Sequence, residues 1–309
     1  MQQTNIETKT AQTILDDAIP VKKIPKFYEV LWREIWKDKL AFISLIIFLG
    51  IVLVSFIWAA TIDEGYATRI EILQMNQAPS DRFPMGTDEG GRDMRNMLIL
   101  GARNSLQIAF IVTLITLVFG SLIGLISGFY GGKVDNIIMR IVDTLSMLPT
   151  LMIIIILIFL SPGYNQWFFI GIMSLFGWIG SARLIRTRAL QQSNLEYAHA
   201  SKTLGTPNLI ILFREVTPNL VSILSVNLVL SLASNIGLET GLTFLGFGLP
   251  PHVPSLGRLL TVAGQPTFIA NRIWQWLPAA ILVIVLVFAI NFIGQAFQRA
   301  VDAKQRMAS

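Results

Sequence analysis

The chain has 309 residues, of which 53% are hydrophobic and only 14% are charged, and its mean hydropathy is +0.61. Soluble globular proteins carry about 25% charged residues, so this composition excludes a water-soluble fold and predicts a membrane protein. Cysteine is absent, which excludes disulfide bonds, thiolate metal sites and thiol nucleophiles. Because the chain has only two histidines, His199 and His252, we expect no histidine-rich metal site.

The N-terminal segment precedes the first long apolar run. Residues 1–20 carry no periodic apolar pattern, and we expect them to be loosely ordered. Residues 26–40 place aromatic and aliphatic side chains four residues apart, with basic side chains among them. This spacing predicts an amphipathic helix in the inner headgroup region of a membrane, with a cytosolic helix packed on a partner as the alternative. The mixed acidic and basic residues before Leu40 do not resemble a cleavable signal peptide.

Stretches free of Asp, Glu, Lys and Arg mark the membrane spans. They cover residues 40–62, 104–132, 144–182, 216–238 and 273–298. A transmembrane helix needs roughly 20 apolar residues, so each stretch holds one span except the third, which is 39 residues long and holds two. The cluster Ser-Pro-Gly-Tyr-Asn-Gln at residues 161–166 predicts the turn between those two spans. The sequence therefore predicts an all-α membrane protein with six transmembrane helices.

The distribution of lysine and arginine predicts the orientation. The expected organisation is a cytoplasmic N-terminal segment (1–39), a first transmembrane helix (40–62), an extracytoplasmic loop (63–103), a core of five helices (104–298) and a cytoplasmic tail (299–309). In this arrangement 17 basic residues lie in inner segments and 7 in outer ones. Since basic residues favour the cytoplasmic side, both termini are predicted to be cytoplasmic. The same bias explains the net charge of +5 without nucleic-acid binding.

The loop between the fourth and fifth predicted spans, residues 183–220, is long and has helical patterning. Residues 196–205 are typical of a helix that ends at Gly205, because glycine tolerates the left-handed cap conformation. Small side chains on this helix offer a surface on which another protein can pack closely: Ala198, Ala200 and Ser201.

A second short helix is predicted directly after this turn. Thr206 suits an N-cap and Pro207 the first helical position, followed by helical residues 209–216. Pro218 is expected to end it. The product is a helix-turn-helix that stands off the membrane.

The pattern from Glu196 through Gly205 to Pro218 resembles the EAA loop of ATP-binding-cassette (ABC) importer permeases, in which a proline follows the glycine by thirteen residues. Aligned on Gly205, the motif's glutamate falls at His199, its second alanine falls at Ser201, and Thr217 replaces the usual leucine. In such permeases this loop docks in a cleft of the ATPase subunit and transmits ATP-driven closure to the membrane helices. The resemblance implies that the ATPase contacts come from Glu196, Ala198, His199, Ala200, Gly205, Thr206, Pro207 and Pro218.

Two further segments resemble the dipeptide and oligopeptide permease family. Residues 86–93 and 101–106 resemble its signature G-T-D-x-x-G-R-D…G-A-R-x-S-L. Glu239 with residues 242–248 and 250–257 resembles its stretch E-x-x-L-S-F-L-G-x-G…P-P-x-P-S-W-G. Within that family the chain is most similar to the C-type subunit of the oligopeptide permease. The resemblance implies a type I ABC-importer permease fold with cytoplasmic coupling helices.

The resemblance also implies an assembly in the cytoplasmic membrane of a prokaryote. Its other members are a second homologous permease subunit, two ATPase subunits and an extracytoplasmic binding protein that delivers oligopeptides. The chain has no G-x-x-x-x-G-K-[ST] loop, since the nearest fragment, Gly131-Gly132-Lys133, is followed by Val134. We therefore expect a non-catalytic subunit with no cofactor of its own, and ATP and Mg²⁺ on the partner ATPases. A nickel or other small-solute permease of the same superfamily is an alternative that shares these motifs.

Polar residues in the predicted spans are few. Arg140 and Asp143 lie three residues apart and are expected to pair near the inner surface. The fifth span has a polar face made of Asn227, Ser231, Ser234, Asn235 and Glu239. That face either lines a path for the peptide or packs helices through small polar side chains, and the sequence leaves both open. No series of ionisable residues crosses the bundle, which argues against an ion-driven secondary transporter.

The outer loop carries three candidate residues for docking the binding protein: Asp88, Arg92 and Asp93. The alternative is a turn-rich connector in which Arg92 and Asp93 satisfy local backbone groups. The spacing of the acidic residues does not match a calcium-binding loop.

Overall fold

The computed structural model describes residues 27–308, and within that range the chain is helical, with one isolated bridge between Thr87 and Asp93 and no strand. The expected loose segment, residues 1–20, lies outside the described range. The helices are α2 (Phe27–Lys37), α3 (Lys39–Ala59), α4 (Glu64–Ala67), α5 (Met94–Tyr130), α6 (Gly132–Ser146), α7 (Thr150–Phe159), α8 (Gln166–Ser193), α9 (Glu196–Thr203), α10 (Asn208–Ile210), a π-helix (Ile211–Val216), α11 (Thr217–Phe244), α12 (Leu256–Leu260), α13 (Pro266–Ile269) and α14 (Ile273–Ala308).

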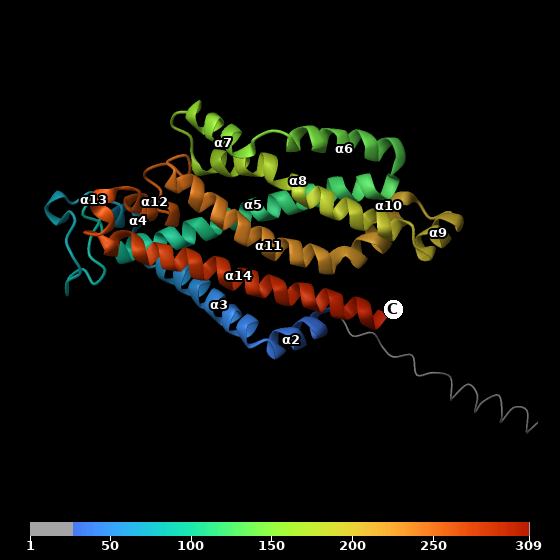
Figure 1. Ribbon diagram of the computed structural model, residues 1–309, viewed down its shortest axis with the longest axis horizontal. Coiled ribbons are helices and arrows are strands. Elements are labelled where there is room, and N and C mark those ends of the chain that lie inside the picture. The colour runs from blue at the N-terminus through green and yellow to red at the C-terminus, as the bar shows by residue number, and fades with distance from the viewer. Residues whose placement is uncertain (1–26, 309) are drawn as a thin grey trace, which may run out of the picture.

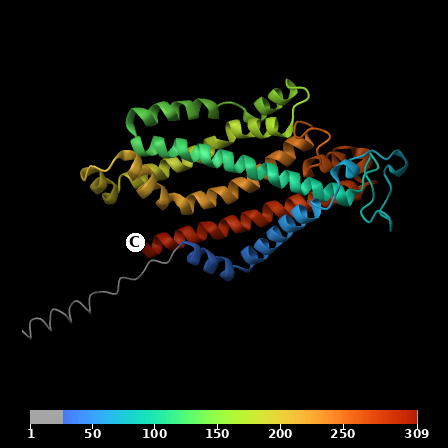
Figure 2. The same cartoon turned by 180° about the vertical axis from the view of Figure 1, so that it is seen from behind.

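The long helices form an elongated bundle with two distinct ends (Figure 1). One end holds α4, α12, α13 and the loop that follows α4, and the other holds α9, α10 and the C-terminus. Seen from both sides, α3 runs along α14, while α6 and α7 lie beyond α8 on the opposite side of the bundle (Figure 2). In the predicted orientation the end with α4 is the outer end and the end with α9 is the inner end, and these names are kept below.

Among residues 27–308, five helices are long and apolar enough to cross a membrane, and a sixth span results if α6 and α7 form one broken span. The axes of α6 and α7 differ by 70°. Pro149 precedes α7 at its cap position, and a proline cannot continue the preceding helix because it lacks an N–H. If α6 and α7 form one span, that span starts at Gly132 rather than at the predicted residue 144. The predicted turn at residues 161–166 is confirmed, with Gly163 at φ +77°.

Two helices continue past predicted segment boundaries that were set at charged residues. Helix α5 begins at Met94, inside the predicted outer loop, because the Asp93 carboxylate accepts the Arg95 N–H and caps the helix. With 37 residues, α5 exceeds the roughly 20 that a span needs, and its outer end carries Arg103, which bonds to Glu64 at 2.6 Å. At the other end of the chain, α14 continues through the predicted tail to Ala308.

The predicted amphipathic helix is present as α2. Val30 and Ile35 are buried, whereas Tyr28, Trp32 and Trp36 are more than half exposed on the opposite face. The helix ends at Lys37, earlier than predicted, because Asp38 accepts the Leu40 N–H at 2.9 Å and starts α3 as a new helix. This arrangement gives α2 an apolar inner face and an aromatic outer face.

The tightest packing joins α5 to α8. Three glycines on α5, at positions 120, 124 and 128, let its backbone approach α8 closely. A Cβ atom added to Gly120, Gly124 or Gly128 would lie 2.4–2.6 Å from a backbone carbonyl oxygen of α8. Small residues at four-residue spacing are typical of close helix pairs in membranes, where dispersion contacts replace the hydrophobic effect.

Candidate functional site

The loop that joins α8 to α11 is an ordered helical unit at one end of the bundle (Figure 1). The predicted first helix is confirmed as α9, and Gly205 adopts φ +82°, the left-handed conformation expected for the residue after a helix. The second helix starts one residue later than predicted. Pro207, not Thr206, occupies the cap position of α10, and no side chain caps it.

Pro218 does not end the second helix, contrary to the sequence prediction. Residues 211–216 form a π-helix that runs directly into α11, where Pro218 lies in the first turn. A proline lacks the N–H that would bond to residue 214 and its ring crowds that carbonyl, so wider i to i−5 spacing is a local solution. The Thr217 hydroxyl bonds to the Leu212 carbonyl, five residues back, at 2.8 Å. The coupling loop is therefore a continuous extension of α11.

Part of the predicted coupling surface is turned into the protein. Ala198 is fully buried in a cluster with Ile211, Leu212 and Val216, so it is not available for close packing by another protein, contrary to the prediction. Other members of the predicted set are exposed: Glu196, His199, Ala200, Gly205, Pro207 and Pro218. Thr206 is half-buried. The exposed face also carries apolar side chains that the sequence analysis did not select, namely Leu204, Leu209 and Phe213.

Side-chain bonds fix α9 to the π-helix. The Ser201 hydroxyl donates to Glu215 Oε2 at 2.8 Å, and the Asn219 amide donates to the Glu215 carbonyl at 2.9 Å. The Lys202 ammonium lies 4.9 Å from the centre of the Phe129 ring at the end of α5. These contacts connect α9 to the π-helix and to the end of α5.

The polar face of α11 is largely occupied by contacts to neighbouring helices. Asn227 donates to the Ser181 hydroxyl of α8 at 2.8 Å, and Asn235 donates to the Thr113 hydroxyl of α5 at 2.9 Å. Both are packing contacts of the kind that the sequence analysis left open. Ser231 is half-buried, with its hydroxyl 3.4 Å from Asn227 Oδ1, and Ser234 is exposed.

Glu239, near the outer end of α11, is fully buried. The Thr243 hydroxyl donates to its carboxylate at 2.9 Å, and Ser105 and Ser255 also lie within hydrogen-bonding reach. Nearby, the Asn104 amide donates to the Pro254 carbonyl at 2.8 Å, across 150 residues of sequence. Residues from both family motifs therefore meet around one buried carboxyl group.

The glycines of these motifs allow the backbone segments around Glu239 to approach one another closely. A Cβ atom on Gly257 would lie 2.6 Å from the Thr240 carbonyl oxygen, and one on Gly101 would lie 3.0 Å from the Ser255 carbonyl carbon. The turn between α7 and α8 reaches the same region, because the Tyr164 hydroxyl donates to the Gly248 carbonyl. Burial there raises the pKa of the Tyr164 hydroxyl.

The outer-loop motif, residues 86–93, is a tight turn held by its own acidic residues. Asp88 accepts the Gly90 and Arg92 backbone N–H groups at 2.8 Å each, and Asp93 caps α5. Gly91 has φ +75°, and a Cβ atom there would lie 2.1 Å from the Glu71 carbonyl oxygen. The carboxylates of Asp88 and Asp93 therefore satisfy local backbone groups. This is the behaviour expected of a turn-rich connector, the alternative to a docking role.

Comparison with known proteins identifies the family. The family model described as the inner membrane component of binding-protein-dependent transport systems matches residues 120–307. The chain belongs to this family. Its membership and the helical bundle confirm the predicted type I permease fold of a multi-pass membrane protein.

Curated relatives are similar to this permease over nearly its whole length. The oligopeptide transport system permease protein OppC of Lactococcus lactis subsp. lactis is 45% identical over 274 residues, 88% of this chain and 93% of the relative. The oligopeptide transport system permease protein AmiD of Streptococcus pneumoniae is 34% identical over 90% of both chains. The dipeptide transport system permease protein DppC of Bacillus subtilis is 33% identical over 89% of this chain and 85% of the relative.

The inner half of the permease contains ion pairs that the sequence analysis assigned wrongly or missed. Asp143 bonds to Arg183 of α8 at 2.8 Å instead of pairing with Arg140 of its own helix. Asp135 of α6 accepts two bonds from Arg186 of α8, each of 2.5 Å. No sequence spacing indicated this pair, because its members are 51 residues apart.

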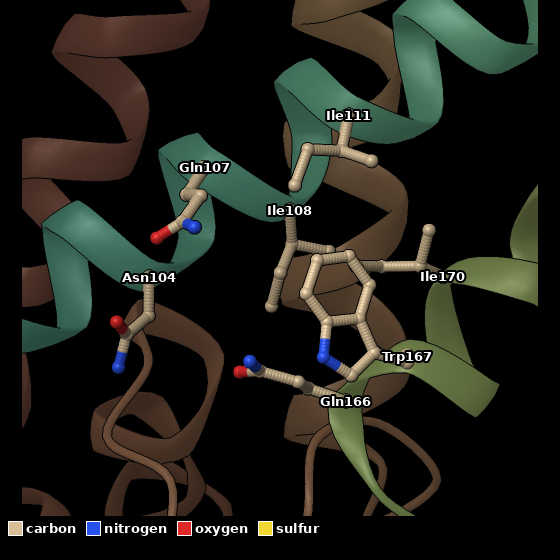
Figure 3. Close-up of a pocket in the computed structure, with 7 residues that line it drawn as sticks. All are labelled: Asn104, Gln107, Ile108, Ile111, Gln166, Trp167 and Ile170. Carbon is tan, nitrogen blue, oxygen red and sulfur yellow. The ribbon is translucent and has the colours of Figure 1, made fainter.

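Near the outer end, a small pocket lies between α5 and α8 (Figure 3). Its walls include Asn104 and Gln107 of α5 and Gln166 and Trp167 of α8. The volume of about 10 Å³ leaves room for about one water molecule, so this pocket cannot hold a peptide. Among residues 27–308, no three His, Asp or Glu side chains lie close enough together to hold a metal ion.

Proposed function

We propose that this chain is the transmembrane permease subunit of an ABC importer that takes up oligopeptides. The observation that carries the proposal is the 45% identity to an oligopeptide transport system permease protein over 88% of the chain. The relatives named for dipeptide or oligopeptide transport favour peptides over nickel or another small solute. The family description, a binding-protein-dependent system, favours an importer over an ion-driven secondary transporter.

In this proposal the bundle end with α9 and α10 faces the cytoplasm of a prokaryote, and both termini lie on that side. The assembly contains a second homologous permease, two ATPase subunits that bind ATP and Mg²⁺, and an extracytoplasmic peptide-binding protein. This chain hydrolyses no ATP. Its part is mechanical, because the coupling loop is continuous with α11 and is bonded to it through Ser201 and Glu215.

The ATPase contacts in this proposal come from the exposed side of the loop. His199 and Ala200 of α9 lie beside the tip residue Leu204, which is 85% exposed. Contact with a partner would remove the exposed apolar surface of Leu204 from water, which favours association. Closure of the ATPases would then move α9, the π-helix and α11 together.

The peptide path in this proposal follows the exposed face of α11, which carries Ser234. Asn227 and Asn235 take part only if their bonds to Ser181 and Thr113 open, because each amide is already engaged. Glu239 is fully buried and organises the outer half of the bundle. Such a path meets peptide backbone groups with hydroxyl and amide partners, which lowers the cost of removing them from water.

Substitution of Leu204 by aspartate tests the coupling role. We expect Leu204→Asp to reduce the amount of ATPase that copurifies with the tagged permease by about tenfold, because a charge would be forced into an apolar contact. ATP-dependent peptide uptake into proteoliposomes should fall in parallel. Leu73→Asp is the matched control, since Leu73 is 94% exposed and belongs to the loop that follows α4, which lies at the opposite end of the bundle from α9 (Figure 1). Equal copurification for Leu204→Asp and Leu73→Asp would refute the proposed contact, and uptake of peptide by this chain alone without ATP would refute the importer.

A further inference from the structure

The outer loop encloses a polar pocket of about 170 Å³ between α4, the segment after it and the start of α5. Three arginines line it, Arg69, Arg82 and Arg92, together with the acidic side chains Glu71 and Asp93. Pockets for small-molecule ligands usually measure roughly 300–1,000 Å³. This pocket is therefore of a size for one or two side chains rather than for a peptide.

The three guanidinium groups have few partners of their own. Arg92 lies 3.6 Å from Asp88, beyond hydrogen-bonding length, and its Nε atom is buried with no acceptor. Arg69 lies 3.9 Å from Glu71, and the Arg82 guanidinium lies 5.2 Å from the centre of the Phe83 ring. Within residues 27–308, none of these side chains donates a hydrogen bond to the protein, although each guanidinium carries five N–H groups. The Asp93 carboxylate is engaged by the Arg95 backbone.

The walls of the pocket are rigid. The Glu71 N–H donates to the Gly90 carbonyl at 2.8 Å, and the Asn76 N–H donates to the Asp88 carbonyl at 2.9 Å. Behind them, the Gln275 amide of α14 donates to the Thr87 carbonyl at 2.8 Å. A site whose walls are already ordered loses little entropy when a ligand enters.

We propose that this pocket receives a carboxylate side chain of the peptide-binding protein, and that Arg69, Arg82 and Arg92 hold it. The inference rests on the proposed function, because it assumes that this end of the bundle faces that protein. A guanidinium fork matches a carboxylate with two parallel hydrogen bonds, and three arginines whose guanidinium groups donate no hydrogen bond to the described residues line this one pocket. Asp88 and Asp93 then shape the loop, and the arginines make the contact.

Affinity measurements on the reconstituted complex test this proposal. The permease complex in nanodiscs is titrated with the purified peptide-binding protein at low and high salt, for the wild type, Arg82→Gln and Arg69→Gln. Both arginines are exposed, so the substitutions should leave the melting temperature unchanged. We expect the Kd to rise by about tenfold or more in each variant, with a weaker dependence on salt. Arg258→Gln is the control, because Arg258 is an exposed arginine of α12 outside the pocket.

Each other outcome overturns a defined statement. An unchanged Kd for Arg82→Gln and Arg69→Gln overturns the pocket, as does an equal loss for Arg258→Gln, which would indicate a general charge effect. Binding of inorganic phosphate that depends on Arg82 while the affinity for the binding protein does not would make the pocket a free-anion site and overturn the proposal. If the wild-type complex neither binds the peptide-binding protein nor imports peptide with ATP, the proposed function itself fails.

Discussion

Asp135 and Arg186 form the best-connected ion pair in the inner half of the bundle. Both carboxylate oxygens of Asp135 accept from the guanidinium, and the Ser127 hydroxyl donates to the same group at 2.5 Å. Asp135 is 8% exposed, so its charge is stabilised mainly by these three bonds. Because Ser127, Asp135 and Arg186 belong to α5, α6 and α8, one cluster of side chains ties three helices together. The same helix, α6, is held to α8 by a second ion pair, between Asp143 and Arg183.

Removal of one member of the pair should destabilise the permease. We expect Asp135→Ala to lower the free energy of unfolding by about 1–3 kcal/mol, since Arg186 loses its partner but remains partly in solvent. Thermal unfolding in detergent measures the change. Arg188→Gln is the control on the same helix, because Arg188 lies 3.4 Å from Gln191 and contributes a weak contact. Equal melting temperatures for Asp135→Ala and wild type would show that the pair adds nothing to stability.

At the scale of elements, the packing of α5 against α8 depends on the absence of side chains. Gly120, Gly124 and Gly128 each face a backbone carbonyl of α8, which fixes both the distance and the register of the two helices. The neighbouring π-helix before α11 has a comparable local cause in Pro218. In both places a single residue type sets the geometry of a whole helix.

A pair of glycine-to-alanine substitutions distinguishes the effect of close helix packing on stability from the effect of helix propensity. A Cβ atom on Gly124 would lie 2.5 Å from the Ala182 carbonyl oxygen, whereas one on Gly180 of α8 would meet nothing within 4 Å. We expect Gly124→Ala to cost about 1–3 kcal/mol through overpacking. Gly180→Ala should stabilise the protein by up to about 1 kcal/mol, because alanine favours the helix. Melting temperatures in detergent check both signs, and a stabilising Gly124→Ala would contradict the close contact.

The whole molecule has two chemically different ends that the bundle holds apart. One end carries the arginine-lined pocket and the motifs around Glu239, and the other carries the coupling loop. Between them the helices expose mostly apolar side chains, as on α3, where Leu53 and Ile57 are more than half exposed. Apolar surface of this extent is stable only against lipid or another apolar partner.

The chain contains no cysteine, so single introduced cysteines report the orientation directly. Leu204→Cys, directly after α9, and Leu73→Cys, in the loop that follows α4, place a thiol at exposed positions of segments that lie at opposite ends of the bundle. In intact cells, we expect a membrane-impermeant maleimide to label Leu73→Cys and to spare Leu204→Cys, and permeabilised cells should show both. The reverse pattern would invert the topology and remove the coupling loop from the cytoplasm.

Much of this organisation was predictable from local sequence. The apolar stretches predicted the membrane-spanning helices, and Gly205 predicted the end of α9. Both features depend on residues that are close together in the chain. Boundaries at charged residues were predicted less well. Arg103 and Asp143 were read as helix limits or local partners, yet they bond to Glu64 and Arg183, which lie 39 and 40 residues away.

The candidate site likewise has features that local sequence predicts and features that only tertiary packing sets. Sequence alone determined the five apolar stretches, the long helical loop and the family motifs, since composition, spacing and motif identity are properties of neighbouring residues. Tertiary structure alone decided that Ala198 is buried, that Glu239 lies where two motifs distant in the sequence meet, and that three outer arginines line one pocket. These features depend on which faces of the helices meet, and that is set by packing across the bundle rather than by order along the chain.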